Sequence, residues 1–493
     1  MVPAHAEAVG ERTLAGRRSF RGVAGQGAGR AGEPRTGATD PTTVNPSGRS
    51  ASPVVGVHIA VSAQASHAVG VCSPPRAFRL RLPFPWVCSV GRLAARCSRA
   101  LGMGAGSVVA GRVVSALRPD ALGLLSAHRS TAVVTGTNGK TTTSHLLAAA
   151  LGEPGGTAHN AAGSNMTDGA VSALLSAPSA RRAVLEVDEL HLGEVLGPSK
   201  AAVVVVLNVT RDQLDRVAEV RSVAGAIRSA LAAAPGVLVV ANADDPMVVW
   251  AVADHDGPVV WVEGTGGWDA DTRACPACGA TVLRGRAPSS DWRCSGCSLG
   301  RPVPAWRWSR EQGTADVVVH HADAPTVVVP LRLPGRANGA NAVMALAAAS
   351  ALGVSVESAS PRLAVVEDAA GRWAVVSRRG RRIRVLLVKN PAGWRAAVDV
   401  LAPEWPVVLA VNAREADGRD VSWLWDLGMT PLRGRAIVAA GERAADVGVR
   451  LGYAEIGHLT EPDPLAAVDL LPAGDVEVLA NYTAFVDLRA RWG

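Results

Sequence analysis

The 493-residue chain has no stretch approaching the roughly 18 consecutive apolar residues of a transmembrane helix, so we expect none. Its N-terminus lacks the basic and then apolar design of a secretory signal peptide, which argues against export. Apolar residues make up 48% and charged residues 19%, so wholesale disorder is excluded and a large core can form. We therefore expect a cytoplasmic protein of two or three domains.

The folded body also lacks the excess of positive charge that the overall value of +7 suggests. Residues 1–100 contain 13 Arg against 4 acidic residues, whereas the remaining 393 residues contain 37 basic and 39 acidic residues. The basic character thus belongs to an N-terminal arm, and we expect no nucleic-acid partner.

Lysine is scarce, since only three of the 50 basic residues are Lys: Lys140, Lys200 and Lys389. Such a dominance of arginine over lysine indicates a bias in the nucleotide composition of the gene. A lysine that is retained despite this bias is therefore a candidate functional residue. The seven cysteines are an odd number, and four of them form one set with metal-ligand spacing. A disulfide framework is therefore not expected.

Composition and periodicity along the chain predict three regions. Residues 1–88 are rich in Gly, Ala, Arg, Ser and Pro without periodicity, which predicts a disordered extension or upstream sequence included in the reading frame. Residues 89–365 alternate helical segments with short, continuous apolar runs, which predicts an α/β domain with a mainly parallel sheet. A cysteine-bearing insert near 272–305 interrupts this domain. Residues 366–493 predict a second, smaller α/β domain.

A glycine-containing turn between a predicted strand and helix favours phosphate binding. Its backbone N–H groups would surround phosphates, Lys140 would reach the β/γ phosphates, and the Thr141 hydroxyl would bind Mg²⁺. Val134 stands where the longer form of this motif has its first glycine. The alternative is a plain turn that caps a helix. The candidate nucleotide-binding residues are Gly136, Thr137, Asn138, Gly139, Lys140, Thr141 and Thr142.

Acidic residues follow another predicted strand, in the segment AVLEVDEL. Glu186 and Asp188 would lie at the same sheet edge as the phosphate loop, where carboxylates suit magnesium and phosphoryl transfer. The alternative is a solvated strand end.

Two CxxC knuckles separated by 15 residues predict a metal site. This spacing suits tetrahedral thiolate binding of Zn²⁺, and four thiolates leave no open coordination position, so the zinc would be structural. The predicted ligands are Cys275, Cys278, Cys294 and Cys297.

The segment TGTNGKTTT resembles the signature of the Mur ligase family, and further matches follow in the same order: the NADDP segment 242–246, Asn338 with Asn341, and Gly371-Arg372. The resemblance implies an ATP-dependent ligase that forms an acyl phosphate. It also implies that Asn338 and Arg372 contribute to the nucleotide site and that Glu186 binds Mg²⁺. Gln213 departs from the family's usual histidine, which argues against an ordinary amino-acid-adding ligase.

The zinc ribbon, the RDQLD segment, and the segments 387–393 and 411–426 together resemble the MurT family, the Mur-ligase-like subunits of lipid II isoglutaminyl synthase. The resemblance covers about residues 89–493. It implies amidation of the D-Glu α-carboxylate of the lipid II stem peptide to D-isoglutamine at the inner face of the plasma membrane. Ammonia would come from a separate, GatD-like glutaminase in a heterodimer. Asp420 would complete the Cys-His arrangement of that partner.

Several alternatives remain open at this stage. Asp417 is the second candidate for the role of Asp420, and the alternative for both is that they form only turn and cap hydrogen bonds. Asp426 is expected to be structural. The arginine-rich run 378–384 favours a solvated hairpin turn over a lipid-phosphate site. The rival functions are an amino-acid-adding ligase of the Mur or folylpolyglutamate type and a non-enzymatic zinc-ribbon binding module.

Overall fold

The residues that the computed structural model describes all belong to the second of the chain's two units, Arg79–Gly493. The described residues are 82–101, 108–152, 156–160, 164–212, 220–265, 269–285, 291–310, 314–322, 324–367 and 373–492. Most of the predicted extension, residues 1–88, lies outside them. Helix α1 nevertheless begins at Phe84, so the predicted end of the extension at residue 88 is too late. Val87, Cys88 and Ala95 on one side of this helix are buried against the next helices and explain the earlier start.

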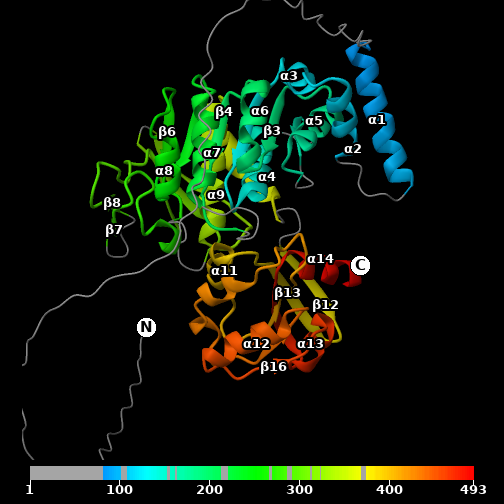
Figure 1. Ribbon diagram of the computed structural model, residues 1–493, viewed down its shortest axis with the longest axis vertical. Coiled ribbons are helices and arrows are strands. Elements are labelled where there is room, and N and C mark those ends of the chain that lie inside the picture. The colour runs from blue at the N-terminus through cyan, green and yellow to red at the C-terminus, as the bar shows by residue number, and fades with distance from the viewer. Residues whose placement is uncertain are drawn as a thin grey trace, which may run out of the picture. The chain divides into compact units, whose positions relative to one another are not determined.

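A nine-stranded sheet forms the centre of the first domain (Figure 1). The strands from β6 to β2 pair in parallel, whereas β9, β10 and β11 pair antiparallel at one edge. This confirms the predicted, mainly parallel sheet. In spatial order the strands are β11(Ala324–Val329), β10(Val317–His321), β9(Trp306–Arg310), β6(Val259–Val262), β5(Leu238–Asn242), β4(Val203–Val206), β1(Ser130–Thr135), β3(Arg182–Glu186) and β2(Thr157–His159).

Both faces of this sheet are covered, which is why its strands are continuous apolar runs rather than alternating ones. In β4, Val204 and Val206 join one hydrophobic cluster, while Val203 and Val205 join the other. Helices α6, α7 and α8 lie side by side over the first face (Figure 1). That side carries α5(Thr167–Ser176), α6(Leu192–Ser199), α7(Val220–Ala232) and α8(Pro246–Val252), and the helices α1(Phe84–Ala100), α2(Val109–Leu117) and α3(Ala121–Ser126) pack on one another and on α5 and α6. The second face is covered by α4(Lys140–Leu151), α9(Arg336–Ala351), α10(Val356–Ala359) and the 3₁₀ segment Ser360–Val365.

The predicted cysteine insert leaves the sheet between β6 and β9. It contains a two-stranded antiparallel hairpin, β7(Val282–Arg284) and β8(Trp292–Cys294). The hairpin packs on α8, because Val249 shares a small hydrophobic cluster with Val282 and Trp292. The insert is therefore anchored to the domain that it interrupts.

The second domain has a six-stranded sheet with β12 antiparallel to β13 and the remaining neighbours parallel. Its order is β12(Trp373–Arg378), β13(Arg381–Leu387), β17(Gly474–Ala480), β14(Val407–Ala410), β15(Ile437–Ala440) and β16(Leu459–Thr460). The arginine-rich run forms the β12–β13 hairpin, where Arg379 and Gly380 have φ of 46° and 73°, as a tight turn requires. The predicted hairpin is confirmed.

Helices cover both faces of this smaller sheet as well. One face carries α11(Pro391–Val398), α12(Ala444–Tyr453) and the 3₁₀ segments Ser422–Asp426 and Thr430–Leu432. The other carries α13(Pro464–Leu470) and α14(Tyr482–Trp492). Within the described part of the chain, no helix combines the length and the apolar character needed to cross a membrane.

Candidate functional site

The phosphate loop joins β1 to α4 through two glycines that no other residue could replace without strain. Gly136 and Gly139 have φ of 130° and 86°, in the region that favours glycine. A Cβ on Gly136 would lie 2.9 Å from the backbone nitrogen of Asn208, and one on Gly139 would lie 2.6 Å from Oδ1 of Asn341. The loop is thus closely packed, and it ends directly at the N-terminus of α4, where backbone N–H groups favour anions.

The segment that follows β4 holds the phosphate loop in place. Thr137 donates its backbone N–H to the carbonyl of Asn208 (2.8 Å), and Asn138 donates its own to Oδ1 of the same residue (3.0 Å). The Asn208 amide in turn donates to the carbonyl of Asn138 (2.9 Å). Thr210 donates its N–H to the Thr137 hydroxyl (3.1 Å). The loop is therefore held in one shape before any ligand binds.

Lys140 is buried in the first turn of α4 and forms an ion pair with Glu189, with 2.9 Å between Nζ and Oε2. Burial alone would lower the pKa of Lys140, but the neighbouring Glu189 and further carboxylates outweigh it and raise that pKa. The ammonium group is thus kept charged at the place where transferring phosphate would need it.

Thr141 and Glu186 meet at the carboxyl ends of β1 and β3, where the Thr141 hydroxyl donates to Oε1 of Glu186 (3.1 Å). The other oxygen of Glu186, Oε2, is buried without a hydrogen-bond donor among the described residues. Asn160 fixes the backbone of Glu186 from both sides, at 2.8 Å each. A hydroxyl and an unsatisfied carboxylate oxygen are ligands that Mg²⁺ prefers, so the residues fit such an ion. Asp188 instead accepts from the N–H of Leu190.

Two of the three lysines contribute to this region, because Lys389 of the second domain pairs with Asp212 (2.6 Å). Asn390 donates to Asp212 (3.1 Å) and to Oδ1 of Asn138 (3.2 Å) in the phosphate loop. Burial would raise the pKa of Asp212, but Lys389 outweighs it, and that pKa is lowered. The adjacent Gln213 lies outside the described residues.

The NADDP segment has a structural role. Asp245 caps α8 by accepting from the N–H of Met247 (2.9 Å), and its other oxygen accepts from the N–H of Val209 after β4 (2.9 Å). Complete burial raises the pKa of Asp245 to about 6. Asp244 pairs with Arg301, which follows the ribbon (2.7 Å). The segment thus links the β4 loop, α8 and the insert.

The other residues expected to contact the nucleotide lie in different surroundings. Asn338 donates to the carbonyl of Pro334 (2.7 Å), whereas Asn341 lies against the phosphate loop at Gly139. Thr142 is buried in α4. Arg372 lies outside the described residues.

The four sulfur atoms of the insert converge. All lie within 4.8 Å of one another, and two pairs are 3.4 Å and 3.7 Å apart. Tetrahedral zinc at about 2.3 Å from each sulfur requires sulfur–sulfur distances of about 3.8 Å, so this cluster fits the ion. The cluster comprises Cys275, Cys278, Cys294 and Cys297.

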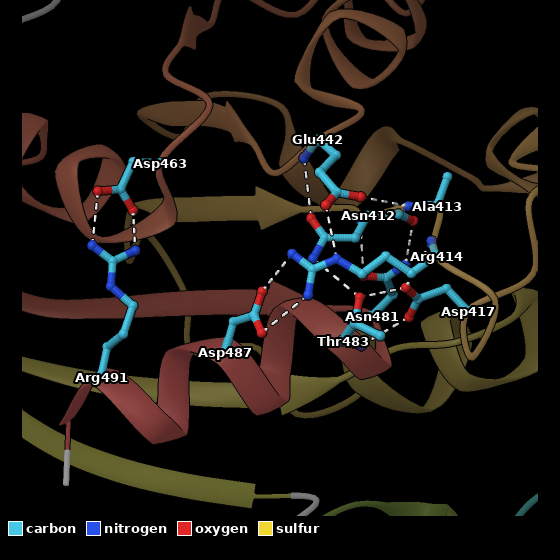
Figure 2. A network of polar contacts seen from close by, with 10 residues as sticks. All are labelled: Asn412, Ala413, Arg414, Asp417, Glu442, Asp463, Asn481, Thr483, Asp487 and Arg491. Carbon is cyan, nitrogen blue, oxygen red and sulfur yellow. Dashed lines mark hydrogen bonds and ion pairs between the residues drawn. The ribbon is translucent and has the colours of Figure 1, made fainter.

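A polar network ties the central loop of the second domain to its sheet (Figure 2). Asn412, after β14, and Asn481, after β17, exchange two hydrogen bonds: the Asn412 N–H donates to Asn481 Oδ1 (3.0 Å), and the Asn481 amide donates to the Asn412 carbonyl (2.7 Å). Arg414 then pairs with Glu442 and with Asp487 of α14, at 2.8 Å each. These contacts join three strand ends and a helix.

The two candidate aspartates differ in what they contact. Asp417 is half-buried and accepts from both the N–H (2.8 Å) and the hydroxyl of Thr483 in the first turn of α14. Asp420 is exposed, and its Oδ1 accepts from the N–H of Ser422 (2.7 Å). Asp426 pairs with Arg211 (2.9 Å), which agrees with the structural role expected for it. Asp420 is thus the aspartate that remains accessible to another molecule.

Sequence reasoning assigned no role to Glu189, Asn208, Asp212 or Lys389. Asn208 and Asp212 stood in a quoted segment, and Lys389 was marked by the scarcity of lysine, but no spacing rule connects them with a loop 49 to 249 residues away. Only the arrangement of strands shows that they meet.

Comparisons with known proteins agree with this geometry. The family model described as Mur ligase middle domain matches residues 134–271, and that described as MurT ligase C-terminal matches residues 387–485. The MurT subunit of lipid II isoglutaminyl synthase from Staphylococcus aureus is 28% identical over 390 residues, which are 74% of this chain and 87% of the relative. The corresponding subunit from Streptococcus pneumoniae is 28% identical over 440 residues, 81% of this chain and 96% of the relative.

Solved structures show the same fold at low identity. The pseudomurein peptide ligase type C from Methanothermus fervidus superposes with a TM-score of 0.59 at 19% identity, covering 73% of this chain and 78% of the other. MurF from Acinetobacter baumannii does so with a TM-score of 0.58 at 19% identity, covering 77% and 80%. The fold and the phosphate loop therefore define a ligase of the Mur type. The chain thus combines a Mur ligase middle domain with a MurT-type C-terminal domain and is similar to MurT subunits over most of its length.

Proposed function

We propose that this protein is the ligase subunit of a glutamine-dependent enzyme that amidates lipid II. The substrate would be the α-carboxylate of D-Glu in the stem peptide, and the product D-isoglutamine. The observation that carries the proposal is the edge formed by Lys140, Thr141 and Glu186, combined with a MurT-type second domain. The substrate and the glutamine dependence come from the names of the MurT relatives.

The reaction would proceed in two steps. A carboxylate oxygen attacks the γ-phosphorus of ATP and ADP leaves, which produces an acyl phosphate. The lone pair of ammonia then attacks the carbonyl carbon, phosphate leaves, and the nitrogen loses a proton. Lys140 would offset the charge on the transferring phosphoryl group. Thr141 and Glu186 would hold Mg²⁺, which neutralises phosphate charge when bound. Asn341 would keep the glycine turn closed.

Ammonia would come from a separate GatD-like glutaminase. Asp420 would orient and stabilise the catalytic histidine of that partner, because it is exposed while Asp417 is engaged with Thr483. The substrate is a lipid, so the complex would act peripherally at the inner face of the plasma membrane. The cysteine cluster would hold one structural Zn²⁺.

The test is amidation of purified lipid II with ATP and glutamine, with and without the candidate glutaminase. We expect D-isoglutamine, detected by mass spectrometry, only when both subunits are present. With ammonium in place of glutamine, this chain alone should retain activity. Addition of an amino acid instead of ammonia would support the amino-acid-adding alternative.

A further inference from the structure

A cavity of about 1000 Å³ separates the phosphate loop from the cysteine insert. It is lined by residues near the phosphate loop, including Thr137, Glu189 and Asp212, and by residues 274–279, which contain the first cysteine knuckle. The N-terminal residues of α7, among them Arg221, also line it. The volume lies at the upper end of typical ligand sites and accommodates a peptide.

The charges that line this cavity are mostly paired. Glu189 pairs with Lys140, and Asp212 pairs with Lys389. Asp271 accepts from the backbone N–H of Arg211 (2.9 Å) and also pairs with its guanidinium. Arg221 differs, because among the described residues it has no carboxylate partner. Its guanidinium carbon lies 5.5 Å from the centre of the Trp250 ring.

We propose that this cavity binds the peptide portion of the acceptor substrate and that Arg221 binds a carboxylate of that peptide other than the one being activated. This inference rests on the proposed function. The reacting carboxylate must reach Lys140, which pairs with the lining residue Glu189, so a second anionic contact at Arg221 would fix the direction of the peptide in the cavity. An arginine stacked on an indole keeps its donors in a plane suited to a carboxylate.

The first cysteine knuckle contributes small residues to the lining of the same cavity. Cys275 is buried in the cluster of Val249 and Trp292, which fixes the knuckle against α8. Pro276 and Ala277 of this knuckle line the cavity, whereas no residue of the second knuckle, 294–297, does so. The insert therefore has two unequal halves: both supply sulfur ligands, and one also shapes the substrate site.

The helix offers a matched control for Arg221. Arg228 also stacks on Trp250, with its guanidinium carbon 5.1 Å from the ring centre, but it does not line the cavity. It pairs with Asp254 and donates to the carbonyl of Trp250 (2.6 Å). Loss of Arg228 therefore removes a stacking contact, an ion pair and a hydrogen bond outside the cavity, whereas loss of Arg221 removes a stacking contact and the positive charge that lines the cavity.

The experiment measures the KM for lipid II and the KM for ATP in the two-subunit complex carrying Arg221→Ala, Arg221→Lys or Arg228→Ala. For Arg221→Ala we expect the KM for lipid II to rise about 10- to 100-fold, the effect of losing a charge-assisted hydrogen bond, with the KM for ATP unchanged. Arg221→Lys should recover part of this loss, and Arg228→Ala should resemble the wild type. An unchanged KM in Arg221→Ala, or an equal rise in Arg228→Ala, overturns the inference while leaving the proposed function intact. A wild-type complex that does not amidate lipid II contradicts the proposed function itself, and this inference with it.

A second pair of variants tests the first knuckle. Ala277→Glu places a negative charge in the cavity, whereas Ser295→Glu places one on the second knuckle, outside it. We expect only Ala277→Glu to raise the KM for lipid II, by about tenfold or more, because it repels an anionic peptide. Zinc content and melting temperature should match the wild type in both variants. Equal KM values in the two variants would show that the first knuckle does not contact the substrate.

Discussion

The two sheets of this protein gather polar side chains at the same edge, the carboxyl ends of their parallel strands, but use them differently. In the central domain the edge retains unsatisfied groups, such as Oε2 of Glu186, next to a glycine loop. In the second domain the corresponding edge is cross-linked, because Asn412 and Asn481 exchange hydrogen bonds and Arg414 pairs with Asp487 of α14. The first edge is prepared for a ligand, whereas the second is a rigid base for one exposed loop. Under the proposed function, a similar architecture would hold the ligase chemistry in one domain and expose Asp420 to the partner subunit in the other.

Removal of the Lys140 charge at the edge of the central sheet should have the largest effect on activity. We expect Lys140→Ala to lower ATP-dependent amidation by about 10³-fold or more, because the ammonium group acts on the transferring phosphate. Steady-state rates with ammonium as the nitrogen source measure this directly. Lys200→Ala, at the exposed end of α6, is the control. Wild-type turnover by a folded Lys140→Ala protein would contradict the assignment of the phosphate loop.

Substitution of Asp420, in the loop at the edge of the second sheet, should affect only the supply of ammonia. We expect Asp420→Asn to lower glutamine-dependent amidation by roughly 10³- to 10⁴-fold, since an amide cannot stabilise an imidazolium as a carboxylate does. Activity with concentrated ammonium should survive in the same preparation, with complex formation checked by size exclusion. Asp417→Asn should instead destabilise the loop and α14 by about 1–3 kcal/mol. Equal loss of both activities in Asp420→Asn would place Asp420 in the ligase chemistry or the fold.

Substitution of a cysteine ligand in the insert should lower the stability of the protein more than its catalytic activity. We expect about one Zn²⁺ per chain by metal analysis, and Cys278→Ser should lower both the zinc content and the melting temperature. Residual activity below the new melting temperature should remain measurable. Absence of zinc in freshly purified, reduced protein would contradict a structural zinc site.

Lowering the pH should destabilise the central domain more than the second domain, and this effect should be smaller than those of the substitutions above. Burial, together with His145, lowers the pKa of His159 in the central domain from 6.5 to about 4. A lowered histidine pKa means that the unfolded chain binds the proton more readily, so stability present above pH 6.5 is lost as the pH falls towards 4. The loss should reach about 3 kcal/mol at most. The second domain contains a single histidine, His458. Urea unfolding measures the free energy of unfolding of wild type and His159→Gln at pH 7 and at pH 4.5. If that free energy falls equally in both proteins between the two pH values, His159 does not contribute.

Much of the site was predictable because its signals are local. The GTNGKT loop, the CxxC pairs and the position of Glu186 each depend on residues close together in the chain, where spacing and strand–turn–helix order determine the geometry. The continuous valine runs predicted the parallel sheet for a similar reason, since burial of both faces requires apolar residues at every position. The end of the extension was misplaced because Phe84 and Val87 become buried only by packing on other helices.

By itself, therefore, the sequence determined the kind of fold, the phosphate loop and the cysteine ligand set. The tertiary structure alone decided which carboxylate pairs with Lys140, which of Asp417 and Asp420 stays exposed, and that one cysteine knuckle lines a cavity near the phosphate loop. These outcomes depend on contacts between residues tens to hundreds of positions apart. Local spacing carries no information about them, because strand order and helix packing bring such residues together only in the folded chain.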